Sequence, residues 1–275
     1  MKTPPPVFQH LGPLAQPPAI AECCRLTERL WLKYLDLAGD YRHTDPNSQE
    51  YLIFRMLYIA EITSSAVRLN ASWGLTHAAM SLLRDRYEQT VRFSWLVRNP
   101  DPLAFQMYER TKFAKMGDLA KAASPETRAH FEKQYGPIPP WASDPLTKDQ
   151  RAFFEEWTQL DLRSMATKRD AFPPICDLPV AEEQLATVYD MIYKQFSSVS
   201  HYDRFSLDLL SLNKLDDGRV YLGSGPHWPG ALILKNAQFD IIQCFEAASV
   251  CHKKDAGLIF NFFLVEWLAI AKQIV

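Results

Sequence analysis

Hydrophobic side chains recur every three or four residues along most of this chain, which is the spacing of a helix that buries one face. Leu26, Leu30, Tyr34 and Leu37 form one such series, and the segment from residue 105 to 119 contains another. Prolines, glycines and capping residues interrupt the pattern repeatedly. The pattern therefore predicts a chain built mainly of α-helices with short connections.

The interruptions indicate where the helices begin and end. Pro18 suits the first turn of a helix. Asn47 and Glu50 have the spacing of a capping box, which opens a helix. Thr147 and Gln150 repeat that spacing. The predicted helices span, by residue number, about 18–38, 48–72, 76–98, 101–123, a short segment from 125, 148–168, 180–201, 236–253 and 256–274.

Three stretches depart from the helical spacing. Between residues 219 and 234, glycine-containing turns bracket short β-branched and aromatic runs, which predicts a small β-hairpin. Residues 1–17 predict a proline-rich extended arm, and residues 136–146 predict a proline-rich internal loop. We therefore predict an all-α fold, with a single helical domain over residues 18–275. It would be a multi-helix bundle of about seven to nine helices with one small β-hairpin near residues 219–234.

The composition excludes several classes of protein. With 275 residues, of which 47% are hydrophobic and 23% charged, the chain is long and apolar enough for a sizeable core. Lys and Arg total 30 and Asp and Glu total 32, and this net charge of −2 does not support binding of nucleic acid or of an anionic membrane. The first residues lack the apolar run of a signal peptide. We expect a soluble, cytoplasmic protein that does not span a membrane.

No motif for a metal or a cofactor occurs in the sequence. The five cysteines include no Cys-x-x-Cys pair, and their odd number does not fit a disulfide framework. Glu-x-x-His pairs, the His-Glu-x-x-His motif and the glycine-rich phosphate loops are also absent. We therefore expect buried thiols in a reducing compartment, no metal and no cofactor.

The last predicted helix is apolar around nearly its whole circumference. Between residues 256 and 271 only Asn261 and Glu266 interrupt the hydrophobic and small residues. Such a helix must be buried on all sides, either in the centre of the bundle or at an interface between subunits. We expect the centre of the bundle, with some contribution to a homodimer.

Polar side chains gather on one side of the predicted helix at residues 76–98. Arg84 and Glu88 lie four residues apart there, beside a hydrophobic side that includes Leu83 and Tyr87. One interpretation is an exposed ion pair that contributes little to the stability of the fold. The other is a polar pocket between helices, in which Arg84 supplies a fixed positive charge and Glu88 a carboxylate.

A second polar stripe lies near the end of the predicted helix at residues 180–201. Its members recur every four residues on one face, with Ser200 beside them: Tyr189, Tyr193, Ser197 and His201. Hydroxyl side chains are unusual in a helix interior because they compete for backbone carbonyls. One interpretation is a fraying helix end, where His201 complements the helix dipole. The other is a site in which these hydroxyls and His201 bond to a ligand or a scissile group.

The two stripes together resemble an all-helical bacterial domain family of unknown function. Its members carry one helix in which Leu-Arg is followed by (Tyr/Phe)-Glu, and a later Tyr-x-x-x-Ser-x-x-x-His helix end. Here the first element is Leu83–Glu88, the second is Tyr193–His201, and Arg110 lies between them. The resemblance covers about residues 51–206. It implies an all-helical fold in which these polar residues, Arg110 included, meet around a ligand, and it implies no particular activity.

A more distant resemblance is to the helical ribonucleases known as HEPN proteins. Their hallmark is an Arg-x(4–6)-His pair near a helix start. Here Lys194, Gln195 and Phe196 occupy the corresponding positions before His201, so the hallmark is absent. Only Arg84, from another helix, could supply the missing positive charge.

Two functions from different classes are compatible with these residues. The first is a helical bundle that binds a small ligand or a partner protein in a defence or stress module, with the arm and the hairpin as docking elements. The second is a helical hydrolase or nuclease-like enzyme that acts on a phosphodiester or a nucleotide. In that enzyme His201 would be the general acid or base, and Arg84 would hold an anionic group of the substrate. Glu88 would orient His201 or Arg84.

Overall fold

The computed structural model describes residues 18–38, 48–73, 75–111, 124–137, 144–172, 184–194 and 197, the segments 212–214 and 220–222, and individual residues between 233 and 272. The predicted arm at residues 1–17, the middle of the predicted proline-rich loop, Ser200 and His201 lie outside these residues. The chain divides into two compact units, Met1–Arg98 with Leu162–Val275, and Asn99–Asp161. The single domain over residues 18–275 stays a prediction.

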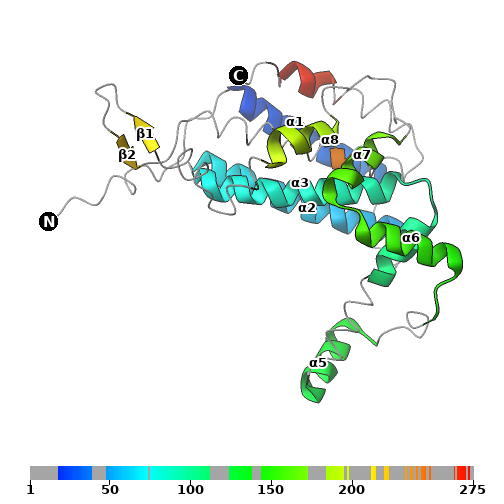
Figure 1. Ribbon diagram of the computed structural model, residues 1–275. Coiled ribbons are helices and arrows are strands. Elements are labelled where there is room, and N and C mark those ends of the chain that lie inside the picture. The colour runs from blue at the N-terminus through cyan, green and yellow to red at the C-terminus, as the bar shows by residue number, and fades with distance from the viewer. Residues whose placement is uncertain are drawn as a thin grey trace. The chain divides into compact units, whose positions relative to one another are not determined.

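The first unit is built of helices (Figure 1). They are α1 (Pro18–Ala38), α2 (Gln49–Ser72), α3 (Thr76–Arg98), α7 (Leu162–Asp170) and α8 (Leu185–Val188), which continues into the π-helix η5 (Tyr189–Tyr193). Helices α1, α2 and α3 begin and end within a residue of their predicted bounds. The all-α prediction is thus confirmed for the described residues, which are predominantly helical.

The second unit, Asn99–Asp161, is helical as well. It contains the helical residues 103–111, α5 (Pro125–Tyr135) and α6 (Lys148–Gln159). Ser124 caps α5 by accepting a hydrogen bond from the N–H of Thr127 at 3.2 Å. Thr147 and Gln150 form the predicted capping box of α6, with bonds of 3.2 and 3.0 Å. Local sequence therefore determines where these helices begin.

Three predicted helix boundaries were wrong. One is the start of the helix predicted from residue 180, because Gln184 has an extended backbone and α8 begins at Leu185. The cap of α2 is Ser48, whose Oγ accepts from the N–H of Tyr51 at 3.2 Å, and not Asn47. The helix predicted over residues 148–168 is interrupted between α6 and α7. Leu160 takes an extended backbone (φ −64°, ψ 118°), which ends the hydrogen-bond ladder of α6. No proline or glycine marks this break, so the break could not be recognised from the sequence.

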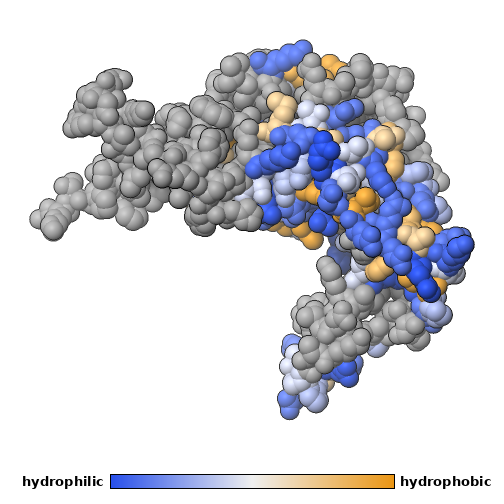
Figure 2. All heavy atoms as spheres, in the orientation of Figure 1, coloured by the Kyte–Doolittle hydropathy of each residue, from blue (hydrophilic) through white to orange (hydrophobic). Residues whose placement is uncertain are grey.

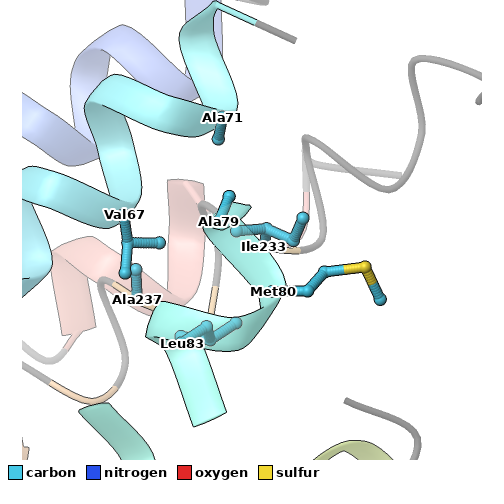
Figure 3. Close-up of a cluster of buried hydrophobic side chains, with 7 residues drawn as sticks. All are labelled: Val67, Ala71, Ala79, Met80, Leu83, Ile233 and Ala237. Carbon is cyan, nitrogen blue, oxygen red and sulfur yellow. The ribbon is translucent and has the colours of Figure 1, made fainter. Parts of the chain in front are cut away.

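The core of the first unit includes a cluster between α2 and α3 (Figure 3). Two of its seven buried residues come from the late part of the chain, more than a hundred residues away in the sequence. The cluster consists of Val67, Ala71, Ala79, Met80, Leu83, Ile233 and Ala237. Fully burying a Val, Leu or Ile side chain contributes roughly 1.5–3 kcal/mol, so this cluster holds the late segment against the first helices.

A short antiparallel strand pair lies at a different place from the predicted hairpin. Strand β1 (Leu212–Lys214) pairs with β2 (Val220–Leu222). The predicted run at 220–222 therefore pairs with residues that precede it, and not with residues that follow it. The described residues do not show a hairpin over 219–234, and most of that stretch lies outside them.

The last predicted helix is buried on one side only. Phe263, Trp267 and Ile270 are 6%, 1% and 7% exposed, but Val265 is 53% exposed. Glu266 accepts two hydrogen bonds from Arg29 of α1, at 2.6 and 3.2 Å. The described part of this helix is therefore not buried all round within one chain, and the homodimer, which would cover Val265, stays a prediction. Within the described residues, no helix has the length and apolar character needed to cross a lipid bilayer.

Candidate functional site

Three of the predicted site residues meet on the surface of the first unit. The Tyr193 hydroxyl donates a hydrogen bond to Glu88 Oε1 at 2.7 Å and accepts one from Arg84 Nε at 3.4 Å. Arg84 Nη2 lies 3.3 Å from the same Glu88 oxygen. The two side chains of α3 and the one from η5 therefore form a closed set of three contacts, which we call the Arg84–Tyr193 site.

The α3 side of the site follows from helical spacing. Arg84 and Glu88 are four residues apart, so they lie one above the other on the same face of α3. Tyr193 comes from more than one hundred residues later in the sequence. Its place depends on how the segment α8–η5 packs against α3, which no local pattern specifies.

Two polar side chains, Asp170 and Tyr87, hold the start of α8 in place. Asp170, at the end of α7, accepts hydrogen bonds from the N–H groups of Leu185 and Ala186 at 3.1 and 2.8 Å. The Tyr87 hydroxyl donates to the carbonyl oxygen of Leu185 at 2.5 Å. Leu185 itself is fully buried. The first turn of α8 is therefore fixed to both α7 and α3, and it carries η5 and Tyr193 with it.

Aromatic rings form the wall behind the site. Tyr189 and Tyr193 stack with ring centroids 4.9 Å apart, and Tyr87 lies 5.2 Å from Tyr193. The Arg84 guanidinium lies over the Tyr193 ring at 5.9 Å, and Lys194 Nζ lies over the Tyr189 ring at 5.7 Å. Cations placed over aromatic faces in this way are attracted by the ring quadrupole. The site thus combines an aromatic wall with two positive charges.

The protonation states of the site follow from burial and from these bonds. Burial raises the pKa of Tyr193 above its ordinary value; Glu88 acts in the same direction and Arg84 in the opposite one. The bond to Tyr193 raises the pKa of Arg84, so the guanidinium stays charged. Burial also raises the pKa of Tyr87. At neutral pH, Tyr193 is therefore a neutral donor between a cation and a carboxylate.

The site remains open to solvent. The Arg84 and Glu88 side chains are 26% and 27% exposed. Beside it, Asp190 accepts hydrogen bonds from Arg163 at 2.8 Å and from Lys194 at 2.7 Å, and these bonds hold the pKa of Asp190 well below its usual range. Hydrophilic residues cover much of the described surface over α7 and α8 (Figure 2). The surroundings of the site are polar and rich in ion pairs.

Of the other predicted site residues, Ser197 is described in the first unit and is not joined to this set. Ser197 is helical and partly buried, and no hydrogen bond links it to Arg84, Glu88 or Tyr193 among the described residues. Ser200 and His201 lie outside the described residues, so their place at the site stays a prediction. Arg110 belongs to the second unit, where it donates to the carbonyl oxygen of Asp144 at 3.0 Å.

A fully buried polar network, which was not predicted from the sequence, lies on the other side of α3. Arg86 has no exposed surface; it donates to Ser64 Oγ at 2.9 Å, to the main-chain oxygen of Asp240 at 3.3 Å and to Cys244 Sγ at 3.0 Å. Thr90 lies 3.7 Å from the same sulfur atom. Burial raises the pKa of Asp240 to about 7, although Arg86 acts in the opposite direction.

A second buried arginine extends this network toward α7. Arg169 donates to Ser94 Oγ at 3.0 Å, to Gln243 Oε1, and to Asp170 Oδ1 at 3.1 Å. The same Asp170 holds the first turn of α8. The buried network therefore supports the surface site through Asp170.

The spacing of polar residues on α3 carried a signal for the buried network. Arg86, Thr90 and Ser94 recur every four residues, which places all three on one side of the helix. Hydrophobic Leu83 and Val97 share that side, and all five residues are buried. Polar residues that recur at helical spacing among core positions must form hydrogen bonds with each other or with another segment, because unpaired buried polar groups are costly.

The chemistry available at the Arg84–Tyr193 site is hydrogen bonding and charge recognition. Arginine binds carboxylates and phosphates through two parallel N–H groups, and a neutral tyrosine hydroxyl both donates and accepts. In the described residues, no group of three or more His, Cys, Asp or Glu side chains could hold a metal ion. The chain matches no model of a protein family, and it has no significant similarity to a curated protein or to a solved structure.

Proposed function

We propose that the Arg84–Tyr193 site binds a small ligand through an anionic group, either a carboxylate or a phosphate. The observation that carries this proposal is the open, hydrogen-bonded set of Arg84, Glu88 and Tyr193. About a quarter of the Arg84 and Glu88 side chains stays exposed, whereas Arg86, two residues away, is completely buried. An arginine that serves packing alone has the environment of Arg86 rather than that of Arg84.

Arg84 has donors left for a ligand. A guanidinium carries five N–H groups. Among the described residues, one of them lies toward Tyr193 and one toward Glu88. The remaining groups match the paired oxygens of a carboxylate or a phosphate. The second oxygen of Glu88 would accept a hydrogen bond from a hydroxyl or amine elsewhere on the ligand.

The site is formed before a ligand arrives. Tyr193 is fixed because Asp170 and Tyr87 hold the first turn of α8, and because its ring stacks on Tyr189. A preorganised site loses less conformational entropy on binding than one that must be ordered by its ligand. This rigidity supports a binding function for the exposed polar set.

The test is a thermal-melt titration of the full chain with inorganic phosphate and, separately, with acetate. A ligand that binds only the folded chain raises the melting temperature in a saturable way. We expect that rise with at least one of the two anions, and we expect Arg84→Ala to lose it. Arg163→Ala is the matched control, because Arg163 is also an exposed, ion-paired arginine next to η5.

Two results would contradict the proposal. One is a wild-type melting temperature that neither anion changes. The other is a response that Arg84→Ala retains in full, because the anion would then bind elsewhere.

A further inference from the structure

Helix α2 has two apolar faces on opposite sides. At about 100° per residue, its buried residues Ile53, Ala60, Val67 and Ala71 fall within one sector, which faces the core. A second series falls within a sector of roughly 100° on the opposite side, with Ile59 at its edge. We call this second series the α2 stripe; it consists of Tyr58, Ile59, Ile62, Leu69 and the C-cap residue Trp73.

The α2 stripe is exposed along its whole length. Tyr58, Ile59 and Ile62 are 52%, 53% and 52% exposed, and Leu69 and Trp73 are 61% and 42% exposed. Single exposed hydrophobic residues are common on protein surfaces, but an aligned series of large ones marks an interaction surface. A helix with apolar stripes on two opposite sides is suited to lie between two packed layers.

We infer that the α2 stripe is the interface of a homodimer, in which the α2 helices of two copies pack antiparallel about a two-fold axis at Ile62. This inference does not depend on the proposed ligand site. The sequence pattern predicted that the last helix contributes to the homodimer. The α2 stripe places the contact between the two copies on α2 instead.

The size of the stripe is appropriate for a dimer of moderate stability. Five large side chains that are each about half exposed offer on the order of 500 Å², and the 24 residues of α2 extend over roughly 36 Å. A standard interface buries about 800 Å² on each partner. The stripe supplies more than half of that area, and the residues along its edges would supply the rest.

The stripe is self-complementary about Ile62. In an antiparallel pair centred there, Tyr58 lies opposite Ala66 of the other copy, so a large side chain meets a small one, and Ile59 lies opposite Ser65. Leu69 lies opposite Arg55, whose methylene stem can cover an apolar side chain while the guanidinium stays in solvent. Tyr51, which shares the sector of the stripe, lies opposite Trp73, and Ile62 meets Ile62. A two-fold interface requires this property, because the same patch serves as both partners.

The charges along one edge of the stripe are paired within the chain, and one basic residue, Arg55, lies within the sector of the stripe. On one edge Arg68 donates to Glu61 at 2.6 Å and to Ser65 at 2.7 Å. Arg55 lies over the ring of Tyr51 at 5.9 Å. The stripe therefore offers a strongly charged partner no unpaired carboxylate and only one basic residue. An apolar partner, such as the same stripe of a second copy, is the better match for it.

Sedimentation of the full chain over a range of concentrations tests the inference. We expect the wild type to sediment as a dimer. Ile62→Glu and Leu69→Lys should each weaken the dimer by about 100-fold or more, because the two-fold axis places every introduced charge in the interface twice. Val265→Glu is the matched control: Val265 is 53% exposed, like Ile62, but belongs to the last helix.

Cross-linking tests the orientation of the helices independently. When Tyr51→Cys chains are mixed with Trp73→Cys chains and oxidised, we expect a disulfide-linked heterodimer. Oxidised wild-type chain shows the background from native cysteines. This second measurement also decides the matter if both charged variants fail to fold, since Tyr51 and Trp73 lie outside the centre of the interface.

Several outcomes would overturn the inference. A wild type that is monomeric at all concentrations would do so, and so would a dimer that persists in folded Ile62→Glu chains. Loss of the dimer in Val265→Glu alone would assign the interface to the last helix. Failure of the mixed chains to cross-link above the wild-type background would exclude the antiparallel arrangement.

Discussion

Asp240 provides the sharpest test of the buried polar network. Its side chain is 1% exposed, and its Oδ1 atom has no hydrogen-bond partner in the described part of the chain. Arg86 bonds to the main-chain oxygen of Asp240 and not to its carboxylate. Burial raises the pKa of Asp240 from 3.8 to about 7, against the opposing charge of Arg86. Replacing Asp240 by asparagine keeps its shape and removes its ionisation.

The sign of the expected effect follows from the direction of this shift. Because the pKa is higher in the folded chain, the folded state holds the proton more tightly than the unfolded state does. The resulting stabilisation is fully present below the ordinary pKa of 3.8 and is lost as the pH rises to about 7. A difference of roughly three pKa units corresponds to about 4 kcal/mol. At about pH 8, Asp240→Asn should therefore be more stable than the wild type by up to about 4 kcal/mol.

The assay is urea unfolding of both chains between about pH 4 and pH 8. The difference between the two free energies of unfolding isolates Asp240, since the other titrating groups contribute to both chains. Asp190→Asn is a control of opposite sign, because ion pairs lower the pKa of this exposed carboxyl. The reasoning is refuted if Asp240→Asn is the less stable chain at about pH 8, or if its difference from the wild type does not vary with pH.

Four further predictions concern the site, the contacts that support it and a helix cap in the second unit. Tyr193→Phe should lower the free energy of unfolding by about 0.5–1.5 kcal/mol in urea, because Glu88 and Arg84 lose their shared hydroxyl. Asp170→Ala should lower it by about 3–5 kcal/mol in the same assay, because it leaves a buried arginine without its carboxylate. Thr147→Ala should lower the stability of the second unit by about 1 kcal/mol, seen as faster amide exchange in α6. His201→Ala should weaken phosphate binding in the melt titration without changing the melting temperature of the free chain.

The sequence predicted the helices of this protein well because their ends are set by neighbouring residues. The capping box at Thr147 and the cap at Ser124 each satisfy N–H groups within their own first turn. Such contacts involve residues three positions apart, so they can be recognised without a structure. The end of α6 at Leu160 was missed for the same reason, since no local signal accompanies it.

Part of the candidate site was also accessible from the sequence. Arg84 and Glu88 are neighbours on any helix that contains both. The family resemblance of the two polar stripes implied that Tyr193 meets them, and the structure brings these three residues together. The stripe did not show which later residue would reach Glu88, because that depends on the packing of α8 and η5.

The local helical structure of this protein was determined by its sequence alone, while the environment of its polar groups was decided by the tertiary structure. Arg84 and Arg86 are two residues apart on one helix, yet one is a quarter exposed and the other is completely buried. Helical spacing places them on different sides of α3, but Arg86 is enclosed only because Asp240 and Cys244, from late in the chain, pack against it. Burial and pKa depend on contacts between distant segments, and local spacing does not specify those contacts.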